Sequence, residues 1–126
     1  MLVIEQLAKG LDLDTEGISA DQFVAAKRNH SVIGFGRIRS YADCAELATV
    51  GVLKEEQRIG IGSMIVNELI RTGPSALFVT CVIPEFFKKF GFQKVEQYPP
   101  VLRKKVDFCK SYDFTEEQIF VMRLDK

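Results

Sequence analysis

Residues 57–62 (QRIGIG) place two glycines and an arginine at the start of a helical pattern. Gly60 and Gly62 carry no side chains at the point where the first backbone N–H groups of a helix have no partner within it. These donors, together with the positive end of the helix dipole, favour a bound phosphate. Arg58 adds a full positive charge beside them. The segment therefore predicts a site for a pyrophosphate-bearing ligand.

Two common phosphate motifs do not fit this segment. A dinucleotide-binding fingerprint needs a third glycine where the chain has Ile65. A P-loop needs lysine and then serine or threonine after its last glycine, but Ser63 and Met64 follow Gly62. A glycine-rich helix start that binds no ligand remains the structural alternative.

Gln57, Gly60 and Gly62 match the acetyl-CoA signature Gln/Arg-x-x-Gly-x-Gly/Ala, so the chain resembles the GNAT acyltransferase superfamily. The resemblance implies acetyl-CoA as co-substrate and no metal, with the pantetheine arm hydrogen-bonded along the preceding strand. It implies these cofactor-binding residues: Val50, Gly51, Val52, Gln57, Arg58, Ile59, Gly60, Ile61, Gly62, Ser63 and Phe87.

Residues 84–92 (PEFFKKFGF) strengthen the resemblance, because they are similar to the short helix and Gly-Phe turn that the family places near the acyl-donor thiol. Phe87 stands where many members carry a tyrosine that protonates the departing thiolate. Two adjacent phenylalanines here, with residues 45–47 (AEL) upstream, resemble the amino-acid N-acetyltransferase branch that includes N-acetylglutamate synthase. The resemblance covers about residues 2–124, most weakly towards the C-terminus.

Glu46 is the candidate general base. It lies in a mostly apolar strand pattern, on the same face as Ala48, where a carboxylate is costly unless it is used. Deprotonating an α-amino group at pH 7 costs only about 1.4 kcal/mol, and burial raises a carboxyl pKa towards a useful range. The alternative is a strand-end side chain that reaches solvent or pairs with Arg37 or Arg39.

Arg37 and Arg39 are the candidate substrate-binding residues. They alternate onto one strand face with Phe35 and Tyr41, and an arginine can bind a carboxylate through two parallel hydrogen bonds. Solvated arginines on a hairpin are the alternative. If the acceptor is an amino acid, one of the two would hold its carboxylate.

Cysteine and histidine chemistry has little support. Cys44, Cys81 and Cys109 are an odd number at long spacings, which argues against a disulfide framework or a zinc site. Cys81 could act as a nucleophile, but a buried cysteine without a nearby base is usually inert. His30 is the only histidine and lies in a turn pattern, so a catalytic triad is poorly supported.

Length and composition limit the class of protein. The 126 residues predict a single domain over 1–126 that buries about two-thirds of its unfolded surface. Lysines and arginines equal aspartates and glutamates at 17 each, so no charge excess points to nucleic acid. No apolar run reaches the length of a membrane span and no basic leader begins the chain, so we expect a cytoplasmic protein without a membrane partner.

The patterns predict an α/β (α+β) fold, a GNAT-like mixed and mostly antiparallel sheet flanked by helices, in which the family's first strand is missing. Because a missing strand exposes a sheet edge, a homodimer is an expectation. Helices are expected at 2–9, 58–72 and 84–90, after a loop at 11–19. Strands are expected at 22–28, 32–40, 44–53, 76–81, 92–97 and 117–124.

The function expected from these features is acetyl-CoA-dependent N-acetylation of a primary amine, by direct attack of the amine on the thioester. The acceptor would be an amino acid or a small analogue. An acyl-CoA-binding sensor or interaction module with weak or no catalysis is the alternative, since Phe87 lacks the usual hydroxyl. A third reading is acetylation of some other amine.

Overall fold

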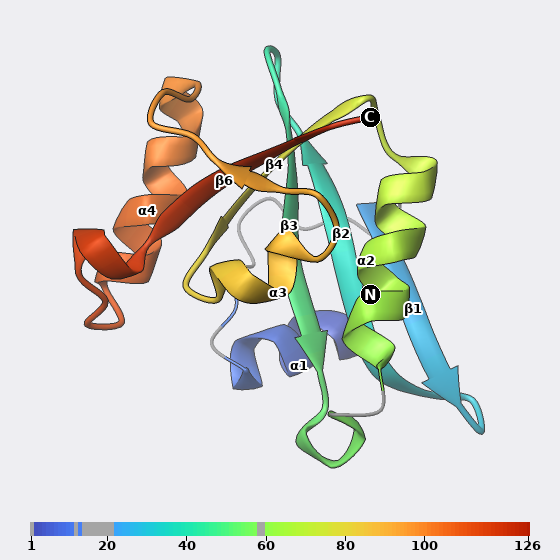
Figure 1. The fold of residues 1–126 in the computed structure, drawn as a ribbon. Helices are drawn as coiled ribbons and strands as arrows, with labels where there is room; N and C mark the ends of the chain where they lie inside the picture. The colour runs from blue at the N-terminus through green and yellow to red at the C-terminus, as the bar shows by residue number, and fades with distance from the viewer. Residues whose placement is uncertain (1, 12, 14–21, 58–59) are drawn as a thin grey trace. The chain divides into compact units, whose positions relative to one another are not determined.

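The computed structural model describes residues 2–11, 13, 22–57 and 60–126 (Figure 1). The chain divides into two compact units. The first comprises Met1–Arg39 and Leu47–Gly73, and the second comprises Ser40–Glu46 and Pro74–Lys126. The expected loop at 11–19 lies almost entirely outside the described residues.

Six strands are hydrogen-bonded in the order β1-β2-β3-β4-β6-β5. Their bounds are β1 Phe23–Arg28, β2 Ser31–Ser40, β3 Ala45–Val52, β4 Ala76–Cys81, β5 Gln93–Lys94 and β6 Phe120–Asp125. β1–β2, β4–β6 and β5–β6 pair antiparallel, whereas β3 pairs with β4 in parallel at Glu46 and Phe78. The mixed, mostly antiparallel sheet flanked by helices confirms the expected fold class.

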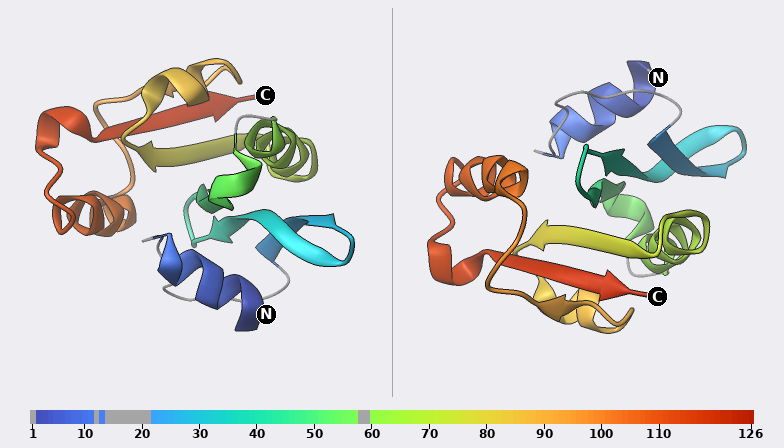
Figure 2. Two further views of the ribbon diagram at one scale, coloured as in Figure 1. Left: turned by 90° about the horizontal axis from the view of Figure 1, so that it is seen from below. Right: turned by 90° about the horizontal axis from the view of Figure 1, so that it is seen from above.

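The first unit packs two helices on opposite faces of its strands, α1 (Leu2–Gly10) and α2 (Ile61–Thr72) (Figure 2). α2 approaches β2 closely, because the side chain of Ile65 occupies the space over two glycines. A Cβ at Gly34 or at Gly36 would lie only 2.9 Å from a carbon of Ile65. The glycines of β2 thus determine how near α2 lies to the sheet.

β1 and β2 form a hairpin whose turn is short. Asn29 and His30 have φ values of 50° and 70°, which matches the two-residue turn whose twist suits antiparallel strands. The turn predicted around His30 is therefore confirmed; Asn29 and His30 form it, and Ser31 begins β2.

The second unit builds its core on one face of β4 and β6. Helix α4 (Arg103–Lys110) follows the 3₁₀ helix η3 (Pro100–Leu102), and both contribute to the core cluster. The buried members are Phe78, Leu102, Val106, Ile119 and Val121. The shorter α3 (Pro84–Lys88) lies on the other side of the β4–β6 pair (Figure 2).

Several expected bounds are corrected by the structure. α2 begins at Ile61, because Gly60 is its N-cap, and residues 58–59 lie outside the described part. α3 ends at Lys88 rather than at 90, before the left-handed Gly91. The strand expected at 92–97 is only Gln93–Lys94, and the last strand starts at Phe120 because η4 (Glu116–Gln118) occupies the residues before it.

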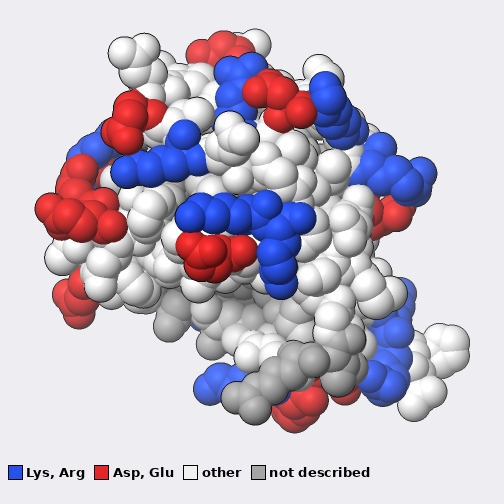
Figure 3. All heavy atoms as spheres, viewed as in Figure 1, with Lys and Arg blue, Asp and Glu red and all other residues white. Residues whose placement is uncertain are grey.

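The surface charges reflect the equal numbers of basic and acidic residues in the sequence. On the face drawn in Figure 3, lysine and arginine side chains are interspersed with aspartate and glutamate. Within the described residues, no helix is both long enough and apolar enough to cross a bilayer.

Candidate functional site

The N-terminus of α2 is built around Gly60. This glycine has φ +85°, a left-handed conformation that a residue with a Cβ adopts only with strain. Its carbonyl accepts the first helical hydrogen bond, from Met64 N–H at 3.1 Å, and no described side chain caps the helix. The N–H groups of Ile61, Gly62 and Ser63 therefore have no partner within the helix. They are suited to bind phosphate oxygens.

The segment before this helix is anchored at two points. Gln57 Nε2 donates to the carbonyl of Val52, the last residue of β3, at 2.9 Å. Arg28, at the end of β1, pairs with Glu56 in the 3₁₀ helix η2 (Lys54–Glu56), with Nη2 and Oε2 2.8 Å apart. In the structure the signature glutamine thus bonds the protein backbone and helps to shape the turn. Arg58 and Ile59, both predicted to bind the cofactor, lie outside the described residues.

β3 contains a conformational irregularity at Thr49. This buried threonine has φ +54°, and a β-branched residue in that region is strained by about 1–3 kcal/mol. A left-handed residue in a strand rotates the next peptide group away from the regular pattern of hydrogen bonds between strands, as in a β-bulge. The irregularity directly precedes Val50, Gly51 and Val52, the residues predicted to hydrogen-bond the pantetheine arm.

Gly51 has a packing role on this strand. A Cβ there would lie 2.7 Å from Leu13 Cδ1 and 2.9 Å from Phe35 Cζ, so any side chain would force these neighbours to move. Val50 packs on the other face, where its Cγ2 lies 3.2 Å from the position that a Cβ on Gly36 would take. The backbone at residues 50 and 51 is therefore packed on both faces of β3.

Arg37 is fully buried, with no exposed surface. Its Nε donates to Thr49 Oγ1 at 2.8 Å and its Nη1 donates to Gln22 Oε1 at 3.0 Å. The guanidinium carbon lies 6.0 Å from the centroid of the Phe23 ring. These partners belong to the protein, whereas the sequence pattern offered Arg37 or Arg39 as a ligand for an acceptor. Arg39, two residues further along β2, is only partly buried.

Glu46 is buried, with 1% of its surface exposed, so it does not reach solvent as a strand-end glutamate would. Its Oε1 accepts a hydrogen bond from the Tyr41 hydroxyl at 3.1 Å. The two residues flank the connection between β2 and β3, where Tyr41 N–H donates to the Cys44 carbonyl at 2.8 Å. The contact places a proton donor beside the candidate base. The sequence pattern placed Tyr41 on the same strand face as Arg37 and Arg39. Only the geometry of the connection between β2 and β3 shows that Tyr41 contacts Glu46.

Phe87 lies in an aromatic cluster and is 5% exposed. Its ring packs edge-on against Phe86 and Phe92, with centroids 5.0 Å and 5.8 Å away. The ring thus has a structural role in addition to the predicted contact with the cofactor.

Cys81 is buried at the end of β4, and burial raises the pKa of its thiol to about 11. Its Sγ lies 3.8 Å from Met122 Sδ. A thiol with this pKa is protonated at neutral pH, which favours an unreactive buried cysteine over a catalytic nucleophile. Among the described residues, no group of three or more histidine, cysteine or acidic side chains could hold a metal ion.

A helix that starts after a left-handed glycine, and that follows an irregular strand of a mixed sheet along the chain, is an arrangement suited to bind a CoA pyrophosphate. Residues 4–92 match the acetyltransferase (GNAT) family. The chain therefore belongs to the GNAT family of acetyltransferases.

The chain is similar to the amino-acid acetyltransferase of Mycobacterium tuberculosis, with 31% identity over 87 residues. The match covers 65% of this chain and 50% of that protein, so the chain spans about half the length of this relative.

Solved structures share the fold. Rv2747 from Mycobacterium tuberculosis, solved in complex with CoA, has a TM-score of 0.75 and 23% identity, over 98% of this chain and 92% of that one. N-acetylglutamate synthase from Neisseria gonorrhoeae, complexed with coenzyme A and N-acetyl-glutamate, also has a TM-score of 0.75, with 20% identity over 99% of this chain and 32% of that one. These two similarities show a shared fold, and the match to the amino-acid acetyltransferase agrees with the branch that the sequence resembles.

Proposed function

We propose that this protein transfers the acetyl group of acetyl-CoA to the primary amine of an amino acid or a close analogue. The observation that carries the proposal is the start of α2, where Gly60 has φ +85° and the following N–H groups have no partner within the helix. Membership of the acetyltransferase family and CoA-bound structures of similar fold support it.

In the proposed reaction the acceptor amine attacks the thioester carbonyl directly. Glu46 takes the proton that the amine loses, either directly or through water. The hydrogen bond from Tyr41 stabilises the charged carboxylate that this role requires. Backbone N–H groups of β3 would polarise the thioester carbonyl, and water would protonate the leaving thiolate. The raised pKa of Cys81 argues against a covalent acetyl-cysteine intermediate.

An amino acid is the favoured acceptor for two reasons. The relatives include a protein named amino-acid acetyltransferase and a synthase complexed with N-acetyl-glutamate. On this chain, β2 offers a partly buried arginine, Arg39, as a partner for a substrate carboxylate. Arg37 was the other candidate, but it has no exposed surface, so an acceptor cannot reach its guanidinium as it can reach Arg39. We therefore assign the carboxylate contact to Arg39.

A CoA-binding sensor with weak or no catalysis is the second candidate function. The buried phenylalanine at position 87 favours it, because the side chain that many family members use as an acid lacks its hydroxyl here. A CoA site would be common to both candidates, and only turnover distinguishes them.

Thiol release from acetyl-CoA tests the proposal. Amino acids, their amides, polyamines and peptide N-termini are supplied in turn, and acetylated products are identified by mass spectrometry. We expect acceptor-dependent release that is fastest with an amino acid. Tight CoA binding without turnover on any acceptor would instead identify a sensor.

A further inference from the structure

We infer that Arg37 is a positioning residue: its guanidinium holds Thr49 in the left-handed conformation and thereby orients the backbone of β3 for acetyl-CoA. This inference rests on the proposed function, and it assigns Arg37 a role other than binding the acceptor.

The first step is the strain at Thr49. A β-branched residue at φ +54° sits in an unfavourable region of the backbone map, so the surrounding structure must hold it there. Thr49 is 3% exposed, so solvent does not provide that support. Its side chain instead accepts a hydrogen bond from Arg37 Nε at 2.8 Å, twelve residues away on the neighbouring strand.

The second step is the anchoring of Arg37 itself. Its Nη1 donates to Gln22 Oε1 at 3.0 Å, and its guanidinium lies near the ring of Phe23 at the start of β1. Phe23 in turn packs edge-on against Phe35, with ring centroids 6.3 Å apart. The guanidinium is therefore fixed between β1 and β3, and its planar fork directs separate N–H groups at two partners. A lysine, with a single nitrogen, cannot reproduce that geometry.

The third step links Thr49 to the cofactor. A left-handed residue rotates the peptide group that follows it, which here carries the N–H of Val50. Val50, Gly51 and Val52 are the residues predicted to bind the pantetheine arm through their backbone. If Thr49 relaxed to an extended conformation, these N–H groups would turn away from the positions that the proposed reaction needs.

The test uses glycine, which adopts positive φ without strain. Arg37→Met should raise the KM for acetyl-CoA and lower kcat. The resulting kcat/KM for acetyl-CoA should fall by about tenfold to a hundredfold, the range expected for a small misplacement of reacting groups. The KM for the acceptor should change little. Adding Thr49→Gly to Arg37→Met should restore most of the loss, because a glycine at 49 no longer needs to be held.

Other outcomes are equally informative. A larger rise in the acceptor KM than in the acetyl-CoA KM, without rescue by Thr49→Gly, would assign Arg37 to the acceptor carboxylate and overturn the inference. A lower melting temperature with unchanged kinetic constants would reduce Arg37 to a fold-stabilising residue. If Arg37→Met does not fold, Thr49→Val removes the accepting hydroxyl and keeps the side-chain shape. It should then raise the acetyl-CoA KM, and an unchanged KM would refute the inference.

The inference can fail separately from the proposed function. If the native protein acetylates no acceptor, the same variants are compared for CoA affinity by calorimetry. If Arg37→Met binds CoA more weakly than the native protein and the added Thr49→Gly recovers the affinity, the positioning role holds for a CoA-binding protein. Unchanged affinity in both variants would reject it.

Discussion

The hydroxyl of Tyr41 donates a hydrogen bond to Oε1 of Glu46 at 3.1 Å, across the connection between β2 and β3. Glu46 is 1% exposed, so this contact is made away from bulk solvent. A buried carboxylate needs such donors, because burial without them is costly. The pair supports Glu46 as the base of the proposed reaction.

Glu46→Gln should lower kcat by roughly a hundredfold to ten-thousandfold with little change in CoA affinity. The loss should shrink at high pH, because the acceptor amine then deprotonates without help. Tyr41→Phe should cause a smaller loss, since it removes only one hydrogen bond to the carboxylate. The exposed Glu117→Gln is the matched control and should behave as the native protein. Equal kcat in native protein and Glu46→Gln would exclude Glu46 as the base.

CoA should stabilise the protein through the start of α2. Acetyl-CoA at a hundred times its dissociation constant should add about 2.7 kcal/mol to the free energy of unfolding. Gly60→Val should abolish that gain, because a β-branched residue opposes φ +85° at the helix N-cap. Gly60→Asn is the control, since asparagine tolerates positive φ and a Cβ there meets no described atom within 4 Å. A native protein that millimolar acetyl-CoA leaves unstabilised would contradict the site.

The acceptor should need its free carboxylate. Amidating it should cost about 2–4 kcal/mol in transition-state binding, because a guanidinium would lose its ionic partner. Arg39→Gln should erase the preference for acid over amide, measured as the ratio of kcat/KM values. If native protein used amides or polyamines equally well, the amino-acid assignment would be wrong, but the cofactor assignment would stand.

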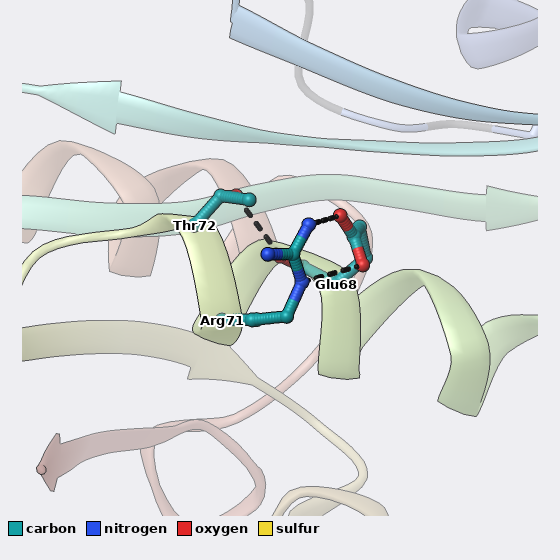
Figure 4. Close-up of polar contacts among 3 residues, drawn as sticks. All are labelled: Glu68, Arg71 and Thr72. Atoms are coloured by element: carbon teal, nitrogen blue, oxygen red, sulfur yellow. Dashed lines mark hydrogen bonds and ion pairs between the residues drawn. The ribbon is translucent and has the colours of Figure 1, made fainter.

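Arg71→Gln provides the arginine control for that experiment. Arg71 Nε donates to Glu68 Oε2 at 3.1 Å, and its Nη2 pairs with the other carboxylate oxygen one turn earlier in α2 (Figure 4). The guanidinium lowers the pKa of Glu68, as expected for a carboxylate beside a cation. This arginine is thus engaged within its own helix, and replacing it should leave the preference for acid over amide unchanged.

Cys81 should be dispensable for catalysis. Burial raises the pKa of its thiol from an ordinary value near 9.0 to about 11, so the folded state retains the proton more tightly than the unfolded state. Its contribution to stability is complete below pH 9 and is lost as pH rises towards 11. Cys81→Ala should keep turnover near the native value. It should also reduce the fall in the free energy of unfolding between pH 9 and 11, which is measured by urea unfolding at each pH. Loss of turnover would instead point to a covalent intermediate.

Local patterns in the sequence determined most of the elements. Apolar residues at helical spacing, followed by the helix-stopping pair Gly73-Pro74, predicted a helix that ends at residue 72, and α2 ends at Thr72. Such signals depend only on residues close together in the chain. The same locality predicted a turn around His30, and the structure shows that Asn29 and His30 make it in the left-handed conformation. The family signature at 57–62 likewise lies in one short segment, which is why it can be recognised without a structure.

The tertiary structure alone decided how the polar residues of β2 and β3 are used. Sequence alternation placed Arg37 and Arg39 on one face as equivalent clamps, yet Arg37 is buried against Thr49 and Gln22. The left-handed Thr49 has no local signal, because a threonine in a strand pattern is expected to be extended. Its conformation depends on an arginine twelve residues away, and the hydrogen bond from Tyr41 to Glu46 depends on a hairpin connection. Such contacts form only when strands pair, so the order of residues along the chain does not show them.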